Sequence, residues 1–138
     1  MPTDLENLAT FCNAWSTDPL NAKAAFEEYR QILNQEGVSF SFKARPGVSY
    51  SLRAKHTRQT KRDLFVLVDV VDDEPDSRWL SVCFYADMVL DPKELGDFVP
   101  QGLMNEDALC FNLDADDAEQ KDYIAARLRE ALHNAEKS

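Results

Sequence analysis

Apolar residues recur every three or four positions in the first part of the chain. Such a stripe over residues 4–15, preceded by a Thr-x-x-Glu capping box, predicts a first helix. A second stripe follows Asp18 and Pro19, a pair typical of a helix start, and ends before Gly37. The amino-terminal part of the chain therefore predicts two helices.

The apolar period then shortens from three or four residues to two. Residues 38–45 and 48–55 alternate apolar and polar side chains, which predicts a β-hairpin with one apolar and one basic face. Pro46 and Gly47 between them favour a tight turn. Because primed turns suit the twist of a hairpin better, we expect the loop to be a residue or two longer.

Three further strands are predicted after the hairpin. Residues 64–71 are β-branched and apolar on both faces except at Asp69, as in a central strand. Residues 78–86 predict a fourth strand, and residues 108–113 predict a short fifth strand. Strands that follow one another through short connections indicate a mainly antiparallel sheet.

The segment 87–107 predicts a long irregular loop, with one short helical turn at about 91–94. The last apolar stripe, with acidic residues in its first turn, predicts a long carboxy-terminal helix over residues 115–135. The element order is thus α-α-β-β-β-β-(short α)-β-α, a single α+β domain over residues 1–138 with a five-stranded sheet. The pattern leaves open whether helices cover one face of the sheet or both.

The composition narrows the classes of partner. The chain carries 25 acids and 15 bases, a net charge of -10, which argues against nonspecific DNA binding and against an anionic membrane surface. Its first residues lack the features of a signal peptide, and no apolar run approaches the length of a transmembrane helix. Cys12, Cys83 and Cys110 are odd in number and widely spaced, so we expect reduced thiols and a cytoplasmic protein.

The charges are strongly segregated along the chain. Residues 37–62 contain seven bases and no acid, whereas residues 63–122 contain 17 acids and three bases. Such asymmetry is typical of a site for an anionic ligand or an acidic partner segment. The alternative is a solvated set of side chains that protects the edge of the sheet. The candidate binding residues on and beside the hairpin are Lys43, Arg45, Arg53, Lys55 and His56.

Aromatic residues on the fourth strand make its second face a further candidate. Trp79 and Tyr85 share that face with Ser81 and Cys83. If helices cover only the other face, this surface needs a cover, because a large apolar patch is unfavourable in water. The amino-terminal helices, the 87–107 loop and a second copy of the chain are the three alternatives.

No motif for catalysis, a cofactor or a metal is present in the sequence. The acids of the 72–76 turn and of the long loop lack the glycine and terminal glutamate of a calcium loop. We therefore assign no catalytic residue, no cofactor and no metal ligand from the sequence.

A non-catalytic binding or interaction domain is the preferred hypothesis, with the basic hairpin face or the apolar sheet face as its surface. Its partner would be a protein, a small anionic ligand or a second copy, as in a homodimer. The alternative is a small enzyme or ligand-binding protein with an anion pocket between the sheet and the 87–107 loop. There Arg53, Lys55 or His56 would hold the anion, and Asp69 or Asp87 would act as base. Binding of an RNA loop is a third hypothesis.

Overall fold

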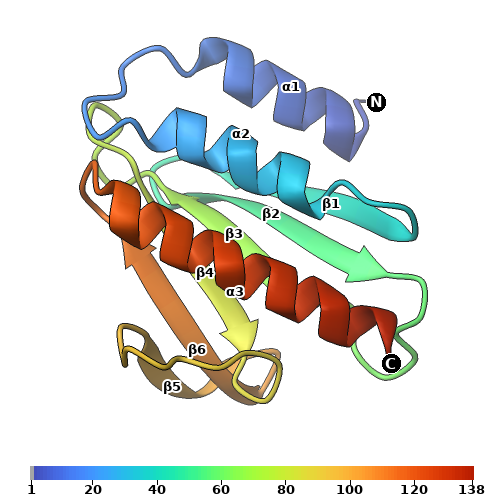
Figure 1. Cartoon of the computed structure of the whole chain (residues 1–138). Coiled ribbons are helices and arrows are strands. Elements are labelled where there is room, and N and C mark those ends of the chain that lie inside the picture. Colours follow the sequence, from blue (N-terminus) through green and yellow to red (C-terminus); the bar gives the residue numbers. More distant parts are fainter. Residues whose placement is uncertain (1) are drawn as a thin grey trace.

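Three helices lie on one face of a six-stranded antiparallel sheet in the computed structural model, which describes residues 2–138 (Figure 1). The elements are α1 (Asp4–Ala14), α2 (Ala22–Leu33), β1 (Val38–Arg45), β2 (Ser49–His56), β3 (Val66–Val71), β4 (Trp79–Tyr85), β5 (Asp97–Leu103), β6 (Glu106–Leu113) and α3 (Ala118–Glu136). The strand order across the sheet is β1-β2-β3-β4-β6-β5. The predicted α+β class and antiparallel sheet are confirmed, but the sheet has six strands, not five.

The extra strand, β5, lies within the segment that was predicted to be an irregular loop. Every residue of β5 except Leu103 is exposed, so the strand carries no alternation of buried and exposed positions. Pro100 and Gly102 also made β5 hard to predict, because both residues are uncommon inside strands. The helical turn predicted at 91–94 is a single hydrogen-bonded turn, in which the Glu94 amide donates to the Asp91 carbonyl over 3.0 Å.

The first two helices begin in different ways. Thr3 caps α1 as predicted, since its hydroxyl oxygen accepts from the Glu6 amide over 3.1 Å. α2 begins at Ala22, later than the predicted start at Asp18 and Pro19. The Asp18 carboxylate nevertheless accepts from the Ala22 amide over 2.8 Å. Asp18 therefore caps α2 from outside the helix, across a turn that ends at Asn21.

The β1–β2 hairpin matches its prediction closely. Ser41 pairs with Arg53 and Lys43 with Ser51, so the basic side chains of both strands project from one face. The loop has three residues, since Arg45 pairs with Ser49. Val48, predicted to be in a strand, belongs to this loop and is exposed.

The core lies between the sheet and the helices. Val68, Val82 and Phe111 are register partners on three neighbouring strands, and all three are fully buried. The Tyr29 hydroxyl of α2 donates to the Lys121 carbonyl of α3 over 2.9 Å, which fixes the two helices side by side. The helices therefore cover one face only, and within the described residues none is long and apolar enough to cross a membrane.

Both edges of the sheet are blocked. On β1, the Phe42 amide donates to the Asp4 carboxylate of α1 over 3.1 Å. On β5, Pro100 has no amide hydrogen, Gln101 has a positive φ of 54°, and the register with β6 shifts between Val99 and Leu103. Edges of this kind resist pairing with another strand. A binding partner would therefore contact the face of the sheet and would not add a strand at its edge.

Candidate functional site

The sheet face turned away from the helices is the candidate site, and we call it the open face. It carries the alternate side chains of the strands, which point away from the core. Its central members are Ser51, Leu67, Asp69, Val71, Trp79, Ser81, Cys83, Cys110 and Asn112. Ser51, Asp69 and Ser81 are successive register partners, so a polar row crosses the middle of the face.

Four basic residues form one flank of the open face. Lys43 and Arg45 on β1 are exposed, and Arg53 and Lys55 on β2 are half-buried. Among residues 2–138, Lys55 is the only one of the four with an ion-pair partner, the exposed Asp63 at 3.8 Å. A contact of this length between solvated groups stabilises little. The flank therefore presents positive charge that the rest of the chain does not neutralise by direct pairing.

Asp69 lies beside this flank, near the centre of the open face. Its Oδ1 atom is buried and has no hydrogen-bond partner among the described residues. Burial raises the pKa of the Asp69 carboxyl above its ordinary value, although the Ser51 hydroxyl and the Arg53 charge act in the opposite direction. Asp69 is thus a largely buried carboxyl beside the basic flank whose burial is only partly offset by its neighbours.

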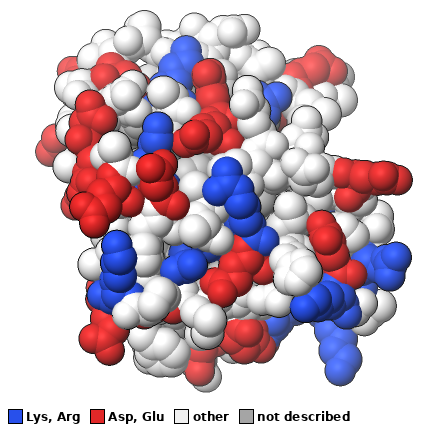
Figure 2. All heavy atoms as spheres, in the orientation of Figure 1, with Lys and Arg blue, Asp and Glu red and all other residues white. Residues whose placement is uncertain are grey.

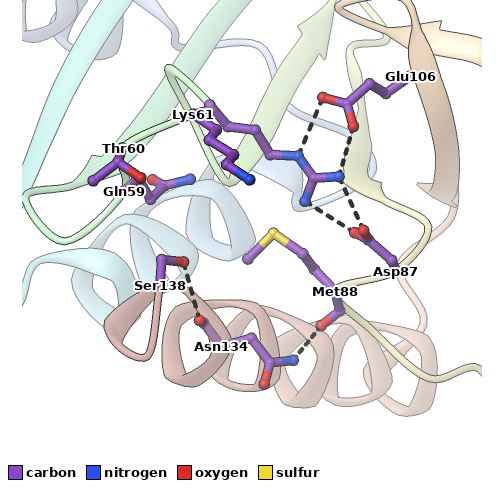
Figure 3. Close-up of a pocket in the computed structure, with 9 residues that line it drawn as sticks. Gln59, Thr60, Lys61, Asp87, Met88, Glu106, Asn134 and Ser138 are labelled. Atoms are coloured by element: carbon purple, nitrogen blue, oxygen red, sulfur yellow. Dashed lines mark hydrogen bonds and ion pairs between the residues drawn. The ribbon is translucent and has the colours of Figure 1, made fainter.

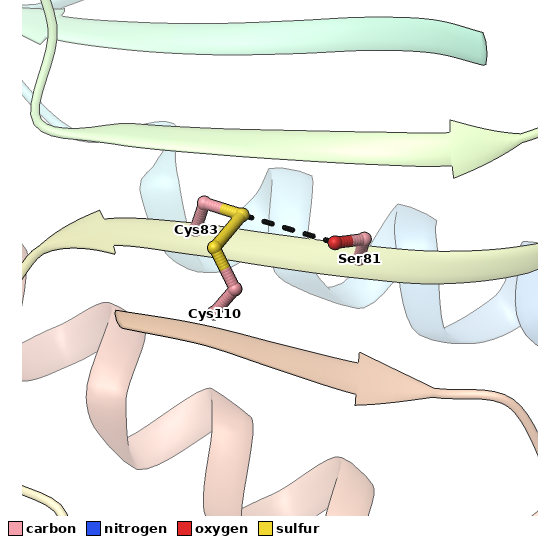
Figure 4. Close-up of a disulfide and its surroundings, with 3 residues drawn as sticks. All are labelled: Ser81, Cys83 and Cys110. Carbon is pink, nitrogen blue, oxygen red and sulfur yellow. Dashed lines mark hydrogen bonds between the residues drawn. A yellow bond between two sulfur atoms is a disulfide. The ribbon is translucent and has the colours of Figure 1, made fainter. Parts of the chain in front are cut away.

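Cys83 and Cys110 form a disulfide on the open face, which corrects the expectation of reduced thiols (Figure 4). They are direct register partners on β4 and β6, with 4.1 Å between their Cα atoms. They are 27 residues apart in the sequence, so no short spacing of the Cys-x-x-Cys kind indicated a bond between them. The thiol argument for a cytoplasmic protein therefore no longer holds. Cys12 is free and buried in the core.

The two predicted aromatic residues have different surroundings. Trp79 is half-buried on the open face, opposite Val71. Tyr85 is only 1% exposed, because the Arg62 guanidinium lies 4.0 Å from the centre of its ring. Arg62 is held there by Glu106 at 2.7 Å and Asp87 at 3.0 Å, and these carboxylates raise its pKa. Tyr85 is therefore unavailable to a partner, whereas Trp79 remains accessible.

His56 does not join the basic flank. It is a buried residue with the same alternation as Leu52 and Ala54, which face the helices. Its Nδ1 atom accepts from the Arg58 amide over 3.1 Å, so the ring fixes the turn after β2. Of the seven predicted binding residues, the structure places Lys43, Arg45, Arg53, Lys55 and Trp79 on the open face, puts His56 on the helix side, and covers Tyr85 with Arg62.

A pocket of about 680 Å³ lies at the end of the sheet near the carboxy terminus (Figure 3). Its walls come from residues 59–62, from Asp87 and Met88, from Glu106 at the start of β6, and from Asn134 and Ser138 at the carboxy-terminal end of the chain. Lys61 points into it, whereas Arg62 is occupied by Asp87 and Glu106. Of the residues predicted for a pocket between the sheet and the loop, only Asp87 lines this one, and its carboxylate binds Arg62.

The pocket lining offers charge and hydrogen bonds more than reactive groups. No histidine or cysteine is among the residues that line it, and its two carboxylates both bind Arg62. The arrangement suits reversible binding of a small polar molecule. In the described part of the chain, no three histidine, cysteine or acidic side chains are grouped in a way that would hold a metal ion.

Comparisons with protein-family models, with curated proteins and with solved structures find no match to this chain.

Proposed function

We propose that this protein is a non-catalytic binding domain whose open face takes an acidic segment of a protein partner. The observation that carries the proposal is the basic flank, in which Lys43, Arg45 and Arg53 have no ion-pair partner within residues 2–138. All 25 acids of the chain lie outside the segment 37–62 that supplies this flank.

Charge segregation favours an acidic partner in two ways. The flank attracts acidic groups and accelerates their encounter with the open face. The remaining surface of this acidic chain repels the same groups, so wrong orientations are disfavoured. The two effects together direct an acidic segment to one place on the molecule.

The apolar residues next to the flank supply contact area. Leu67, Val71 and Trp79 lie on the two central strands, within the same face as the bases. Tryptophan and arginine are the residue types most often found at the energetic centres of interfaces. Because both sheet edges are blocked, the partner would dock through side chains and not by adding a strand.

Charge reversal on β1 tests the proposal. The probe is a fluorescently labelled peptide rich in Asp and Glu with interspersed Leu, and binding is measured by anisotropy at low and at physiological salt. We expect the Lys43→Glu, Arg45→Glu double variant to bind at least about tenfold more weakly than the natural chain, because both residues are exposed and their loss leaves the core intact.

The matched control is the Arg129→Glu, Lys137→Glu double variant, which makes the same change of charge at two exposed bases on and just after α3, on the opposite side of the sheet from the open face. It should bind within about twofold of the natural chain, since screening limits the reach of exposed charges to about 10 Å. Equal losses in the two variants would show that net charge alone attracts the peptide, and the proposed site would be wrong.

A further inference from the structure

A second surface lies on the helix side of the molecule, around the segment that joins β4 to β5. Residues 86–96, here called the strap, run along α3 in the opposite direction. The Met88 carbonyl accepts from the side-chain Nδ2 of Asn134 over 2.7 Å, and the Leu90 backbone amide donates to the Glu130 carboxylate over 2.8 Å. The strap is therefore fixed to the helix and presents its outer side chains in a defined arrangement.

The end of the strap is held equally firmly. The Asp91 carboxylate accepts from the Leu95 and Gly96 amides over 3.0 Å and 2.8 Å, and the Tyr123 hydroxyl donates to it. Gly96 passes so close to Phe111 that a Cβ atom at position 96 would lie 2.8 Å from the ring. This turn therefore requires glycine and leaves little freedom to the chain.

The side chains that the strap and β5 expose are large and apolar. Leu90 is 71% exposed, Leu95 47% and Phe98 59%, and we call these three residues the ridge. Five of the seven large hydrophobic residues exposed within residues 2–138 fall between positions 90 and 104. Concentrated exposure of this kind marks a surface that another molecule covers.

Acidic residues surround the ridge. Residues 86–122 contain 11 acids and only two bases. Figure 2 views the helix side of the molecule and shows acidic side chains gathered around the amino-terminal end of α3. Lys93, the only base of the strap, is paired with Glu119 at 3.5 Å. A partner of the ridge therefore needs apolar groups flanked by positive charge.

We propose that the ridge is a docking site for a cationic amphipathic helix of a partner protein. Such a helix presents apolar side chains three, four and seven positions apart, with Lys or Arg beside them. A partner strand is disfavoured here because Pro100 and Gln101 interrupt the edge of β5. A second copy of the chain is disfavoured by its own net charge of -10.

The probe for this site is a synthetic helical peptide with Leu at those spacings and Lys elsewhere, titrated by anisotropy. The Leu90→Ser, Phe98→Ser double variant should bind at least about tenfold more weakly, because the apolar contact area is lost. The matched control is Leu5→Ser with Val48→Ser, which removes two hydrophobic residues of similar exposure, 56% and 57%, elsewhere on the surface. The control should stay within about twofold.

A charge-reversal pair separates the ridge from general attraction between acid and base. Glu94→Lys with Asp97→Lys should weaken the peptide about tenfold, whereas Asp73→Lys with Glu74→Lys, in a distant exposed turn, should not. The Lys43→Glu, Arg45→Glu variant should bind the cationic peptide at least as well as the natural chain. The inference is therefore independent of the function proposed for the open face.

Three results would overturn the inference. The first is no saturable binding of the cationic peptide to the natural chain. The second is an equal loss in the ridge variants and their controls. The third is a sedimentation mass of two chains that returns to one in the Leu90→Ser, Phe98→Ser variant, because the ridge would then be covered by a second copy. Circular dichroism and urea midpoints establish that each variant is folded.

Discussion

Truncation of Arg78 tests how the core tolerates buried charge. The side chains of Arg78 and Asp72 are only 15% and 4% exposed, and Arg78 Nε lies 2.6 Å from Asp72 Oδ1. The other carboxylate oxygen of Asp72 accepts from the Gly47 amide over 2.8 Å. Arg78→Ala would leave Asp72 buried with that single hydrogen-bond donor. Most of the interactions that offset the cost of burying the carboxylate charge would then be lost.

The expected loss of unfolding free energy is about 3–5 kcal/mol, the usual cost of removing one partner from a buried ion pair. The guanidinium carbon also lies 5.2 Å from the ring centre of Phe11 and 5.7 Å from that of Trp15, so favourable contacts with aromatic faces are lost as well. A domain of this size is stable by about 5–15 kcal/mol. Arg78→Ala should therefore lower the thermal midpoint by roughly 10 °C or more.

Urea unfolding followed by tryptophan fluorescence measures this effect, because Trp15 lies beside the pair and Trp79 is the next residue in the chain. Asp72→Asn, alone and combined with Arg78→Ala, completes a double-mutant cycle. The double variant should be more stable than the sum of the two single losses predicts. A loss below about 1 kcal/mol for Arg78→Ala, or strict additivity, would refute the argument that the pair compensates buried charge.

Two further predictions concern the open face. Burial raises the pKa of Asp69 in the folded state, so its contribution to stability is most favourable below the ordinary aspartate pKa and is lost as the pH rises through the raised value. Asp69→Asn should therefore be more stable than the natural chain at neutral pH, and its unfolding free energy should depend less on pH above the ordinary aspartate pKa. A variant less stable than the natural chain at neutral pH would contradict this. Reduction of the Cys83–Cys110 disulfide, which closes a 27-residue separation, should lower the unfolding free energy by about 3 kcal/mol on addition of dithiothreitol, whereas a Cys83→Ser, Cys110→Ser variant should not respond to the reductant.

The hairpin could be predicted because one of its faces is buried. The alternation over residues 38–55 has a physical cause, since Leu52 and Ala54 enter the core while Arg53 and Lys55 do not. β5 could not be predicted for the opposite reason. All of its residues except Leu103 are exposed, so burial leaves no period of two in the sequence.

The sequence predicted only some of the residues of the candidate site correctly. Alternation was sufficient to place the four basic residues together, and the same alternation puts His56 on the helix side, a signal that its basic neighbours obscured. The burial of Tyr85 depends on Arg62, which reaches it from the connector between β2 and β3. The disulfide depends on the adjacency of β4 and β6. Contacts of these two kinds arise from tertiary structure and leave no local pattern.

The strand order has a consequence for biosynthesis. The first four strands pair in the order in which they leave the ribosome, but the chain then builds the outermost strand β5 before it returns as β6. One edge of β4 consequently stays unpaired until β6 has been made up to residue 113. β4 carries the core residues Leu80, Val82 and Phe84, so this unpaired strand is apolar. A nascent chain that has completed β4 but not yet β6 exposes an apolar strand edge. In this state, protection by a chaperone against misassembly matters most.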